Sequence, residues 1–370
     1  MKPLVSILIP AFNAEQWIAD CLRCAVSQTW PYKEIIVVDD GSKDRTLAIA
    51  KQFESKFLNI FTQENQGAAA TRNNAFAMCQ GDYVQWLDAD DLMSPEKTAK
   101  QVEVVEHAHN RRLLISSAWG LFMHRPYRAK FRPGPLWHDL PPPEWLMRKM
   151  ENNTYMQTAT WLVSRELAEA AGPWDTRLLG DDDGEFFCRV LLASEGTRFV
   201  PGARVYYRQA GAGSLSYIGF SNRKLEAQWI SMKLHIKYLR SLQDDQRARA
   251  ACVTYMQNWM SSFYPERLDI FQEAEELAKS LGGKLRVPPL SWKYSWIDSL
   301  FGRPKAKRTQ VLLPRIKWSL IRSWDRALSQ VQAEGFVNVD NNQSDRPKPN
   351  FAASETYADS VNDPDRGLIG

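Results

Sequence analysis

Residues 5–10 read V-S-I-L-I-P, and residues 34–40 read E-I-I-V-V-D-D. Val, Ile and Leu dominate both stretches, and neither shows the strict alternation of apolar and polar residues that marks a strand with one solvated face. Strands that are buried on both faces have this composition, and they are typical of parallel sheets covered by helices on either side. The two stretches therefore predict an α/β fold.

Strand and helix signals continue to alternate through the N-terminal half of the chain. Asn13 is placed to cap a helix whose inner face carries Trp17, Cys21 and Leu22. The further elements expected are helices at 44–53, 67–78, 165–171 and 185–192, and strands at 59–62, 82–87, 112–118 and 204–208. This order predicts a mostly parallel sheet flanked by helices.

The character of the chain changes beyond residue 220. Residues 222–281 have a helical pattern, whereas residues 286–326 contain ten Lys or Arg against two Asp, with four Trp interleaved. The last forty residues are acidic and rich in Asn, Ser and Pro, which is typical of a disordered tail. We therefore expect a catalytic domain at 1–220, a helical, basic and Trp-rich extension at 221–330, and a tail at 331–370.

Composition narrows the class of protein. Hydrophobic residues make up 44% of the chain and charged residues 24%, which is ordinary for a globular protein, and the net charge of +4 does not indicate a nucleic-acid partner. The apolar run at 5–9 is too short for a signal peptide, so a cytoplasmic location is expected.

Trp together with Lys and Arg favours a membrane interface, so residues 286–326 predict peripheral contact with the inner face of the membrane. The alternative is a helical subdomain that packs its Trp side chains on the catalytic domain.

Polar side chains follow three of the expected strands. They are Asn13, the pair Asp39 and Asp40, and the run at 88–91. Ligands of open parallel sheets bind at the carboxyl ends of the strands, and Mg²⁺ or Mn²⁺ prefers carboxylate oxygens together with substrate phosphates. The acidic run is therefore a candidate metal site, although the same residues could only cap the helix that follows. The chain lacks the Gly-rich motifs of dinucleotide-binding folds and P-loops.

Five motifs in order resemble the family 2 glycosyltransferases, over roughly residues 4–217. They are V-S-I-L-I-P-A-F-N-A-E at 5–15, I-I-V-V-D-D-G-S-K-D-R-T at 35–46, E-N-Q-G-A-A-A-T-R-N-N-A at 64–75, G-D-Y-V-Q-W-L-D-A-D-D at 81–91 and G-D-D-D-G-E-F-F-C-R-V at 180–190. The resemblance implies the A-type nucleotide-binding fold. It also implies inverting, metal-assisted transfer of one sugar, of the hexosyltransferase type, from a nucleotide-diphosphate sugar, with UDP the expected nucleotide. The acceptor would be a glycan, lipid-linked or protein hydroxyl in glycan or polysaccharide biosynthesis.

The resemblance also implies roles for residues that would bind the donor. Asp40 matches the carboxylate that accepts a hydrogen bond from the base, Arg72 a cation near the nucleotide, and Asp88 an acid that touches the ribose. The loop that cups the nucleoside is matched by Pro10, Ala11, Phe12, Asn13 and Glu15.

Further matches concern the chemistry. Asp90 matches the metal-binding acid of a D-x-D motif, which would hold Mn²⁺ or Mg²⁺, and Asp183 matches the general base, with Asp182 the next candidate. Asp182 replaces the Glu that the family usually has, and Ala210 stands where the family often has His, two residues after Arg208. The chain also lacks the Q-x-x-R-W motif and membrane helices of processive synthases, which favours transfer of one sugar at a time.

Two other classes of protein share parts of this pattern. A non-catalytic nucleotide-sugar-binding module would use the same pocket without needing a base. A nucleotidyltransferase would be expected to carry a Gly-rich phosphate loop after the first strand, where this chain has P-A-F at 10–12. An acid at the position of the base therefore favours the enzyme.

Overall fold

A computed structural model describes residues 2–209, 221–288 and 290–337 of the chain. The chain divides into two compact units. The first comprises residues 1–122 and 126–289, and the second comprises residues 123–125 and 290–370. The division therefore lies near residue 290 and not near residue 220, where the change in sequence pattern places it.

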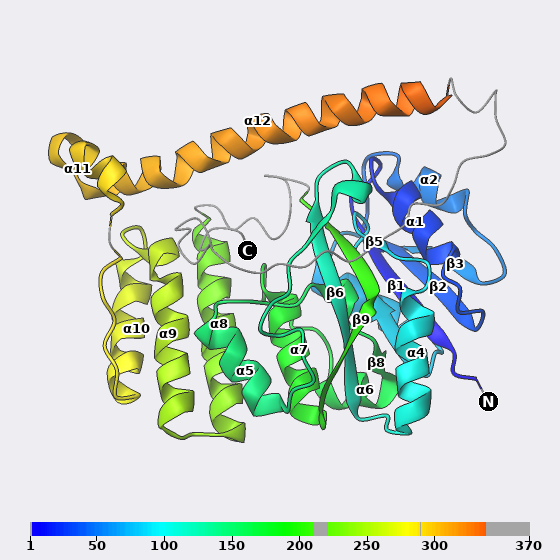
Figure 1. Cartoon of the computed structure of the whole chain (residues 1–370), viewed down its shortest axis with the longest axis horizontal. Coiled ribbons are helices and arrows are strands. Elements are labelled where there is room, and N and C mark those ends of the chain that lie inside the picture. Colours follow the sequence, from blue (N-terminus) through cyan, green and yellow to red (C-terminus); the bar gives the residue numbers. More distant parts are fainter. Residues whose placement is uncertain (1, 210–220, 289, 338–370) are drawn as a thin grey trace, which may run out of the picture. The chain divides into compact units, whose positions relative to one another are not determined.

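A five-stranded sheet forms the centre of the first unit (Figure 1). Its strands are β1 (Val5–Ala11), β2 (Lys33–Asp39), β3 (Leu58–Thr62), β4 (Tyr83–Trp86) and β8 (Val163–Ser164), in the order β3-β2-β1-β4-β8. β8 pairs antiparallel with β4, and the other pairs are parallel. The predicted α/β fold with a mostly parallel sheet is confirmed.

A second sheet has four strands in the order β5-β9-β6-β7. They are β5 (Leu92–Met93), β6 (Leu113–Phe122), β7 (Lys130–Phe131) and β9 (Gly196–Arg208). β6 and β9 run parallel, whereas β5 pairs antiparallel with β9, so that Leu92 lies opposite Tyr206. This pairing brings the acidic run at 88–91 next to the end of β9.

Seven helices surround these sheets in the part of the unit that precedes residue 194. They are α1 (Ile18–Val26), α2 (Thr46–Lys51), α3 (Ala68–Met78), α4 (Lys97–Ala108), α5 (Pro142–Glu151), α6 (Arg165–Ala171) and α7 (Asp182–Ala193). Cys21 and Leu22 lie on the buried face of α1, as expected. Asn13 does not cap α1, because the helix begins only at Ile18 and the Asn13 side chain accepts a hydrogen bond from the backbone N–H of Lys43 at 2.9 Å.

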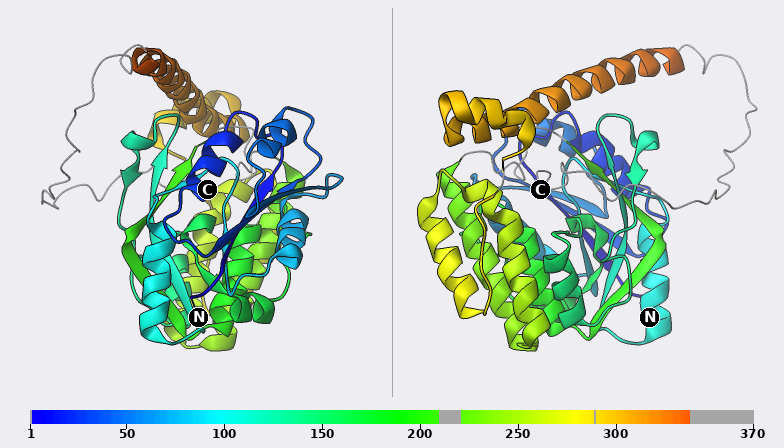
Figure 2. Two further views of the ribbon diagram at one scale, coloured as in Figure 1. Left: turned by 90° about the vertical axis from the view of Figure 1, so that its right-hand side faces the viewer. Right: turned by 60° about the vertical axis from the view of Figure 1, so that its left-hand side comes forward.

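Three further helices complete the first unit: α8 (Asn222–Leu242), α9 (Gln246–Phe263) and α10 (Leu268–Ser280). They lie side by side, and the right-hand view of Figure 2 brings them forward. Trp229 of α8, Met256 of α9 and Phe271 of α10 share one hydrophobic core with Phe186 of α7. Because this core is continuous, these helices belong to the same unit as the sheets and are not a separate extension.

The second unit consists mainly of α11 (Ser295–Phe301) and α12 (Arg303–Val337). Ile297 and Ala306 are buried, and the two helices contact each other. The first residues of the predicted tail, 331–337, are helical, and residues 338–370 lie outside the described part of the chain. None of the helices in the described ranges has the combination of length and apolar character that crossing a bilayer requires.

Candidate active site

A buried arginine joins three segments at the carboxyl end of the central sheet. The Arg72 guanidinium, supplied by α3, donates to Asp88 Oδ1 at 2.8 Å and to Asp182 Oδ2 at 2.7 Å. It also lies 4.5 Å from the centre of the Trp174 ring. Only 6% of Arg72 is exposed, so the two ion pairs are shielded from water. Arg72 therefore holds the loop after β4 and the start of α7 in fixed positions.

Asp183 is the neighbouring acid on α7, and it is not paired with Arg72. Its Oδ2 accepts a hydrogen bond from Thr158 Oγ1 at 3.1 Å, and its Oδ1 accepts one from the backbone N–H of Gly184 at 2.9 Å. Burial, followed by the charges of Asp182 and Asp181, raises the pKa of Asp183 to about 7. A carboxylate that titrates near neutral pH is suited to take up a proton during a reaction.

Asp182 differs from Asp183 in its surroundings. Burial raises the pKa of Asp182, and the charge of Arg72 opposes that rise. Because one of its oxygens bonds to the guanidinium, its charged form is stabilised by a partner that Asp183 lacks. Of the two acids that the sequence indicates as the base, the geometry favours Asp183.

Asp181 connects this cluster to α8. Its backbone has φ = 55°, and its Oδ2 accepts hydrogen bonds from Ser231 Oγ at 2.6 Å and from Gln228 Nε2 at 3.3 Å. His235 lies close by, and burial lowers its pKa to about 4, so its ring is neutral at neutral pH. A Cβ added to Gly184 would collide with the Asp181 carboxylate, so any larger residue at that position would displace the Asp181 side chain. The sequence offers no local sign that α8 helps to fix the start of α7.

Two carboxylates after β4 provide candidate metal ligands. Burial, and to a smaller extent the charge of Asp88, raises the pKa of Asp90 to about 6. Among the described residues, no side chain donates a hydrogen bond to the Asp90 carboxylate, and Arg208 donates only to the backbone carbonyl of Asp90. Two acids that repel each other in this way fit a divalent cation, which would relieve the repulsion. No group of three or more His, Cys, Asp or Glu suited to a metal occurs among the described residues. Substrate phosphates and water would therefore have to complete the coordination.

Asp91, the third acid of the run, has a structural role. It is fully buried, and its carboxylate accepts hydrogen bonds from the backbone N–H of Arg208 at 2.8 Å and from the Gln157 amide. The Arg208 guanidinium in turn donates to the carbonyl oxygen of Asp90 at 2.7 Å. These bonds fix the loop that carries Asp88 and Asp90. The departure from the family at Ala210 lies outside the described residues.

The expected nucleoside loop is hydrogen-bonded to the turn after β2. Besides the bond from Lys43 to Asn13, Glu15 accepts one from the backbone N–H of Arg45 at 3.1 Å. Pro10 and Ala11 end β1, with Ala11 buried, whereas half of the Phe12 surface is exposed. The loop is thus fixed by its ends and presents an aromatic ring to solvent.

Asp40 lies just beyond β2 and is nearly fully buried. Its two carboxylate oxygens accept hydrogen bonds from the Gln63 and Asn65 side chains and from the backbone N–H groups of Gln66 and Gly67, at 2.8 to 3.1 Å. These four donors fill the lone-pair sites of a carboxylate. A base could bond to Asp40 only by displacing one of them.

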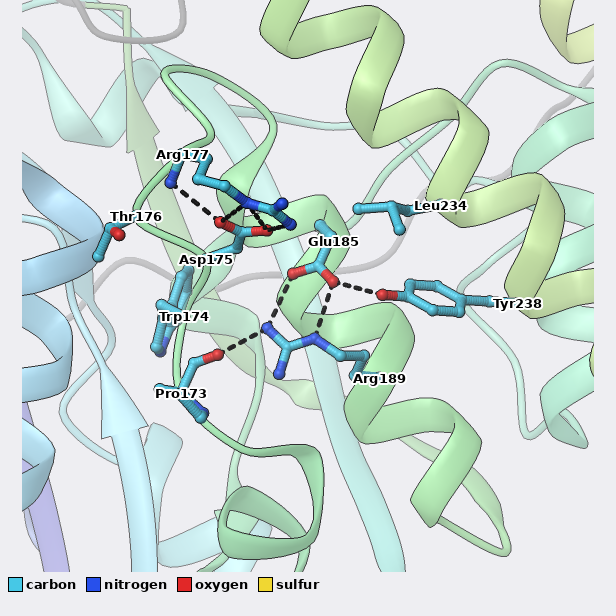
Figure 3. A pocket seen from close by; sticks show the side chains of 9 residues that line it. All are labelled: Pro173, Trp174, Asp175, Thr176, Arg177, Glu185, Arg189, Leu234 and Tyr238. Atoms are coloured by element: carbon cyan, nitrogen blue, oxygen red, sulfur yellow. Dashed lines mark hydrogen bonds and ion pairs between the residues drawn. The ribbon is translucent and has the colours of Figure 1, made fainter.

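A shallow pocket lies beside Trp174, between α7, α8 and the loop before α7 (Figure 3). Within it, Glu185 accepts hydrogen bonds from Tyr238 Oη at 2.6 Å and from the Arg189 guanidinium, and Asp175 pairs with Arg177. The acidic side chains of the pocket are thus paired with its arginines. None of the predicted site residues lines the pocket.

Part of the chain is similar to known proteins. Residues 6–169 match the family described as Glycosyl transferase family 2. The chain contains a family 2 glycosyltransferase domain. The domain is 41% identical over 105 residues to the putative teichuronic acid biosynthesis glycosyltransferase TuaG of Bacillus subtilis, a match that covers 28% of this chain and 42% of TuaG. It is 33% identical over 130 residues to the uncharacterized glycosyltransferase RT0329 of Rickettsia typhi, covering 35% of this chain and 41% of that protein. The matches thus span about two fifths of these relatives.

Solved structures share the fold of this chain. Residues 1–349 of S. aureus TarS superpose with a TM-score of 0.58 at 16% identity, over 77% of this chain and 81% of that one. The same TarS segment in complex with UDP gives a TM-score of 0.59 at 17% identity, over 75% and 80% of the two chains. The likeness therefore extends beyond the residues matched by the family.

The candidate site contains residues that the sequence analysis did not single out. Thr158 contacts the candidate base, Trp174 packs on Arg72, and Ser231 with Gln228 holds Asp181. All four come from segments without a motif of their own, and they reach the site only through tertiary packing.

Proposed function

We propose that this chain transfers a single sugar from a UDP-sugar to an acceptor hydroxyl, with inversion at the anomeric carbon. The observation that carries the proposal is the arrangement of Asp183, with its raised pKa, beside the Arg72–Asp88–Asp182 cluster at the carboxyl end of the sheet. The solved TarS structures, described as complexes with UDP and with UDP-GlcNAc, support the choice of donor.

In the proposed reaction, the ionised Asp183 carboxylate takes the proton from the acceptor hydroxyl as that oxygen attacks the anomeric carbon. A new carbon–oxygen bond forms on one face of the sugar, while the bond to the diphosphate breaks on the other and its electron pair leaves with UDP. Asp90 would hold Mn²⁺ or Mg²⁺, which when bound would supply positive charge to the departing diphosphate, and the neighbouring Asp88 would touch the ribose. Thr158 orients the base, and Arg72 fixes the distance between Asp88 and α7.

The acceptor is proposed to be a hydroxyl of a glycan, a lipid-linked saccharide or a protein. TuaG is named for teichuronic acid biosynthesis, which favours a glycan under construction. We propose that residues 119–155, which the sequence pattern predicts to form a loop and which in fact include the end of β6, β7 and α5, bind it.

A thermal-shift panel of nucleoside diphosphates and their sugars tests the donor. With Mn²⁺ present, UDP and one or more UDP-sugars are expected to raise the Tm, because a ligand at a hundred times its Kd stabilises the fold by about 2.7 kcal/mol. GDP and UMP at the same concentration serve as controls and should raise the Tm less. Equal shifts with GDP and UDP, or no shift with any uridine nucleotide, would contradict the assignment of the donor.

Asp181→Asn provides a test of the base by pH. The charge of Asp181 helps to raise the pKa of Asp183, and an Asn side chain can still accept the hydrogen bonds from Ser231 and Gln228. The variant is therefore expected to keep its rate at pH 8 within about tenfold of wild type. Since the base must be ionised, the acid limb of its kcat/KM profile should move to lower pH. An acid limb that stays in place would argue that another group is the base.

A further inference from the structure

Exposed apolar side chains are concentrated in the second unit. Of the eighteen large hydrophobic residues that are exposed within the described ranges, ten lie between residues 292 and 324. A contiguous group of this kind marks an interaction site on a protein that is otherwise normally packed. The group is therefore the strongest candidate for a surface that binds something beyond the sugar donor and acceptor.

Four of the six large exposed apolar residues of α12 line up along the helix, whereas Leu312 and Trp318 lie about 120° from the middle of their face. Leu313, Leu320, Ile321 and Trp324 follow the spacing i, i+7, i+8 and i+11, which places them on one face, and they are 39 to 71% exposed. At 100° per residue, Arg308, Arg322 and Arg326 lie about 160° away from the middle of this face. The helix is thus amphipathic, with an apolar face opposite a basic one.

Lys317 lies within the apolar face, and its position helps to identify the occupant. A long lysine side chain can extend its ammonium to the polar level of a lipid surface while its methylene groups stay among apolar atoms. A coiled-coil partner would instead need an apolar seam that is sustained at heptad spacing. If Leu313 and Leu320 occupied one apolar position of a heptad, the other would fall at residues 316, 323 and 330, which are Ile, Ser and Gln. The Ser and the Gln would interrupt such a seam.

The segment before α12 adds aromatic residues and charge. Trp292, Trp296, Leu300 and Phe301 are each more than half exposed, and Trp prefers the level of the lipid headgroups. Residues 286–326 carry ten Lys or Arg against two Asp, which complements a surface of anionic lipids. Both the charge and the aromatic residues therefore match a membrane surface.

We propose that α11 and α12 bind an anionic membrane surface, with α12 lying in the plane of the interface and its Leu313–Trp324 face inserted among the lipids. This inference goes beyond the proposed transfer of sugar and does not depend on it. Basic residues near such a surface are attracted to its anionic lipids, and each inserted apolar side chain adds a favourable contribution proportional to its buried area.

Flotation of the full chain with lipid vesicles tests the proposal. The protein is expected to float with phosphatidylcholine vesicles that contain phosphatidylserine, to float less at high salt, and to remain unbound with phosphatidylcholine alone. The double variant Leu320→Glu/Trp324→Glu should bind the vesicles at least about tenfold more weakly than wild type, because it places two charges in the inserted face. Leu268→Glu, at an exposed leucine of α10 in the first unit, is the matched control and should bind as wild type does.

The UDP-induced shift in Tm is measured on the same samples, so that loss of the fold or of donor binding is distinguished from loss of membrane binding. Unchanged flotation of the double variant would overturn the proposal, as would equal binding to neutral and anionic vesicles or no binding to either. Self-association that the double variant abolishes, without any binding to vesicles, would assign the apolar face to a second copy of this chain and would also overturn it.

Discussion

Asp183→Asn is expected to lower the rate of sugar transfer by about 10² or more at neutral pH, with the affinity for the UDP-sugar unchanged within a few-fold. The variant keeps the size of the side chain and its hydrogen bond from Thr158, but it removes the group that accepts the proton. Asp269→Asn is the matched control, since Asp269 is an exposed acid of α10 whose one ion-pair partner among the described residues is nearby Arg267.

The pKa of Asp183 adds a second observable to this prediction. Its value of about 7 means that the wild-type enzyme loses its ionised base as the pH falls through neutrality, so kcat/KM should decrease on the acid side. Transfer by Asp183→Asn at a rate close to wild type would place the base elsewhere, with Asp182 the next candidate. If no acceptor supports turnover by the wild type, the chain would instead be a nucleotide-sugar-binding module.

Asp90→Asn is expected to nearly abolish transfer and to weaken the binding of Mn²⁺ in the presence of UDP by about tenfold or more. An amide replaces a charged oxygen ligand, and only Asp88 then remains to balance the cation. Binding can be followed by the Mn²⁺ paramagnetic resonance signal, which does not depend on activity. Asp244→Asn, an exposed acid between Arg240 and Arg249, serves as the control.

The stability of the metal-free variant gives a further check. Asp90 has a pKa raised to about 6, above its value in the unfolded chain, so its ionised form destabilises the fold at neutral pH. Removing that charge should leave the Tm of Asp90→Asn unchanged or slightly higher than that of wild type. Full activity of the variant, or of the wild type in excess chelator, would contradict the assignment of the metal.

The strands around the site are readable from the sequence because burial on both faces leaves an uninterrupted apolar run. β1 and β2 match the predicted stretches to within one residue, and the acids that follow β2 and β4 lie at the same edge of the sheet because the strands are parallel. The positions of Asp40 and Asp88 therefore follow from local pattern and the rules of parallel sheets.

The partners of these acids are not readable in the same way. Arg72 and Asp182 are 110 residues apart, and Asp181 meets Ser231 fifty residues further on, across an interface between two helices. A periodic pattern shows which face of a helix is buried and not what covers it. For the same reason the sequence could not separate Asp91, held by Gln157 and Arg208, from the acids placed to bind a metal.

The extent of the first unit is a similar case. The sequence changes character near residue 220, yet α8 to α10 share a core with α7. The amino-acid composition of a helix depends on how much of its surface is buried. A helix that packs on the catalytic domain therefore has the same sequence pattern as a helix in a separate bundle. The division is visible only when the contacts of Trp229 and Phe186 are known.

The stereochemistry of the product tests the central claim most directly. Wild-type protein is incubated with Mn²⁺ and an α-linked UDP-sugar, with water as the acceptor, and the anomeric proton of the released sugar is followed by NMR before mutarotation. The proposed attack from the face opposite UDP predicts that the β-anomer appears first, in step with UDP, and that Asp183→Asn suppresses its formation. Initial release of the α-anomer, or no release of UDP from any UDP-sugar, would contradict inverting transfer at this site.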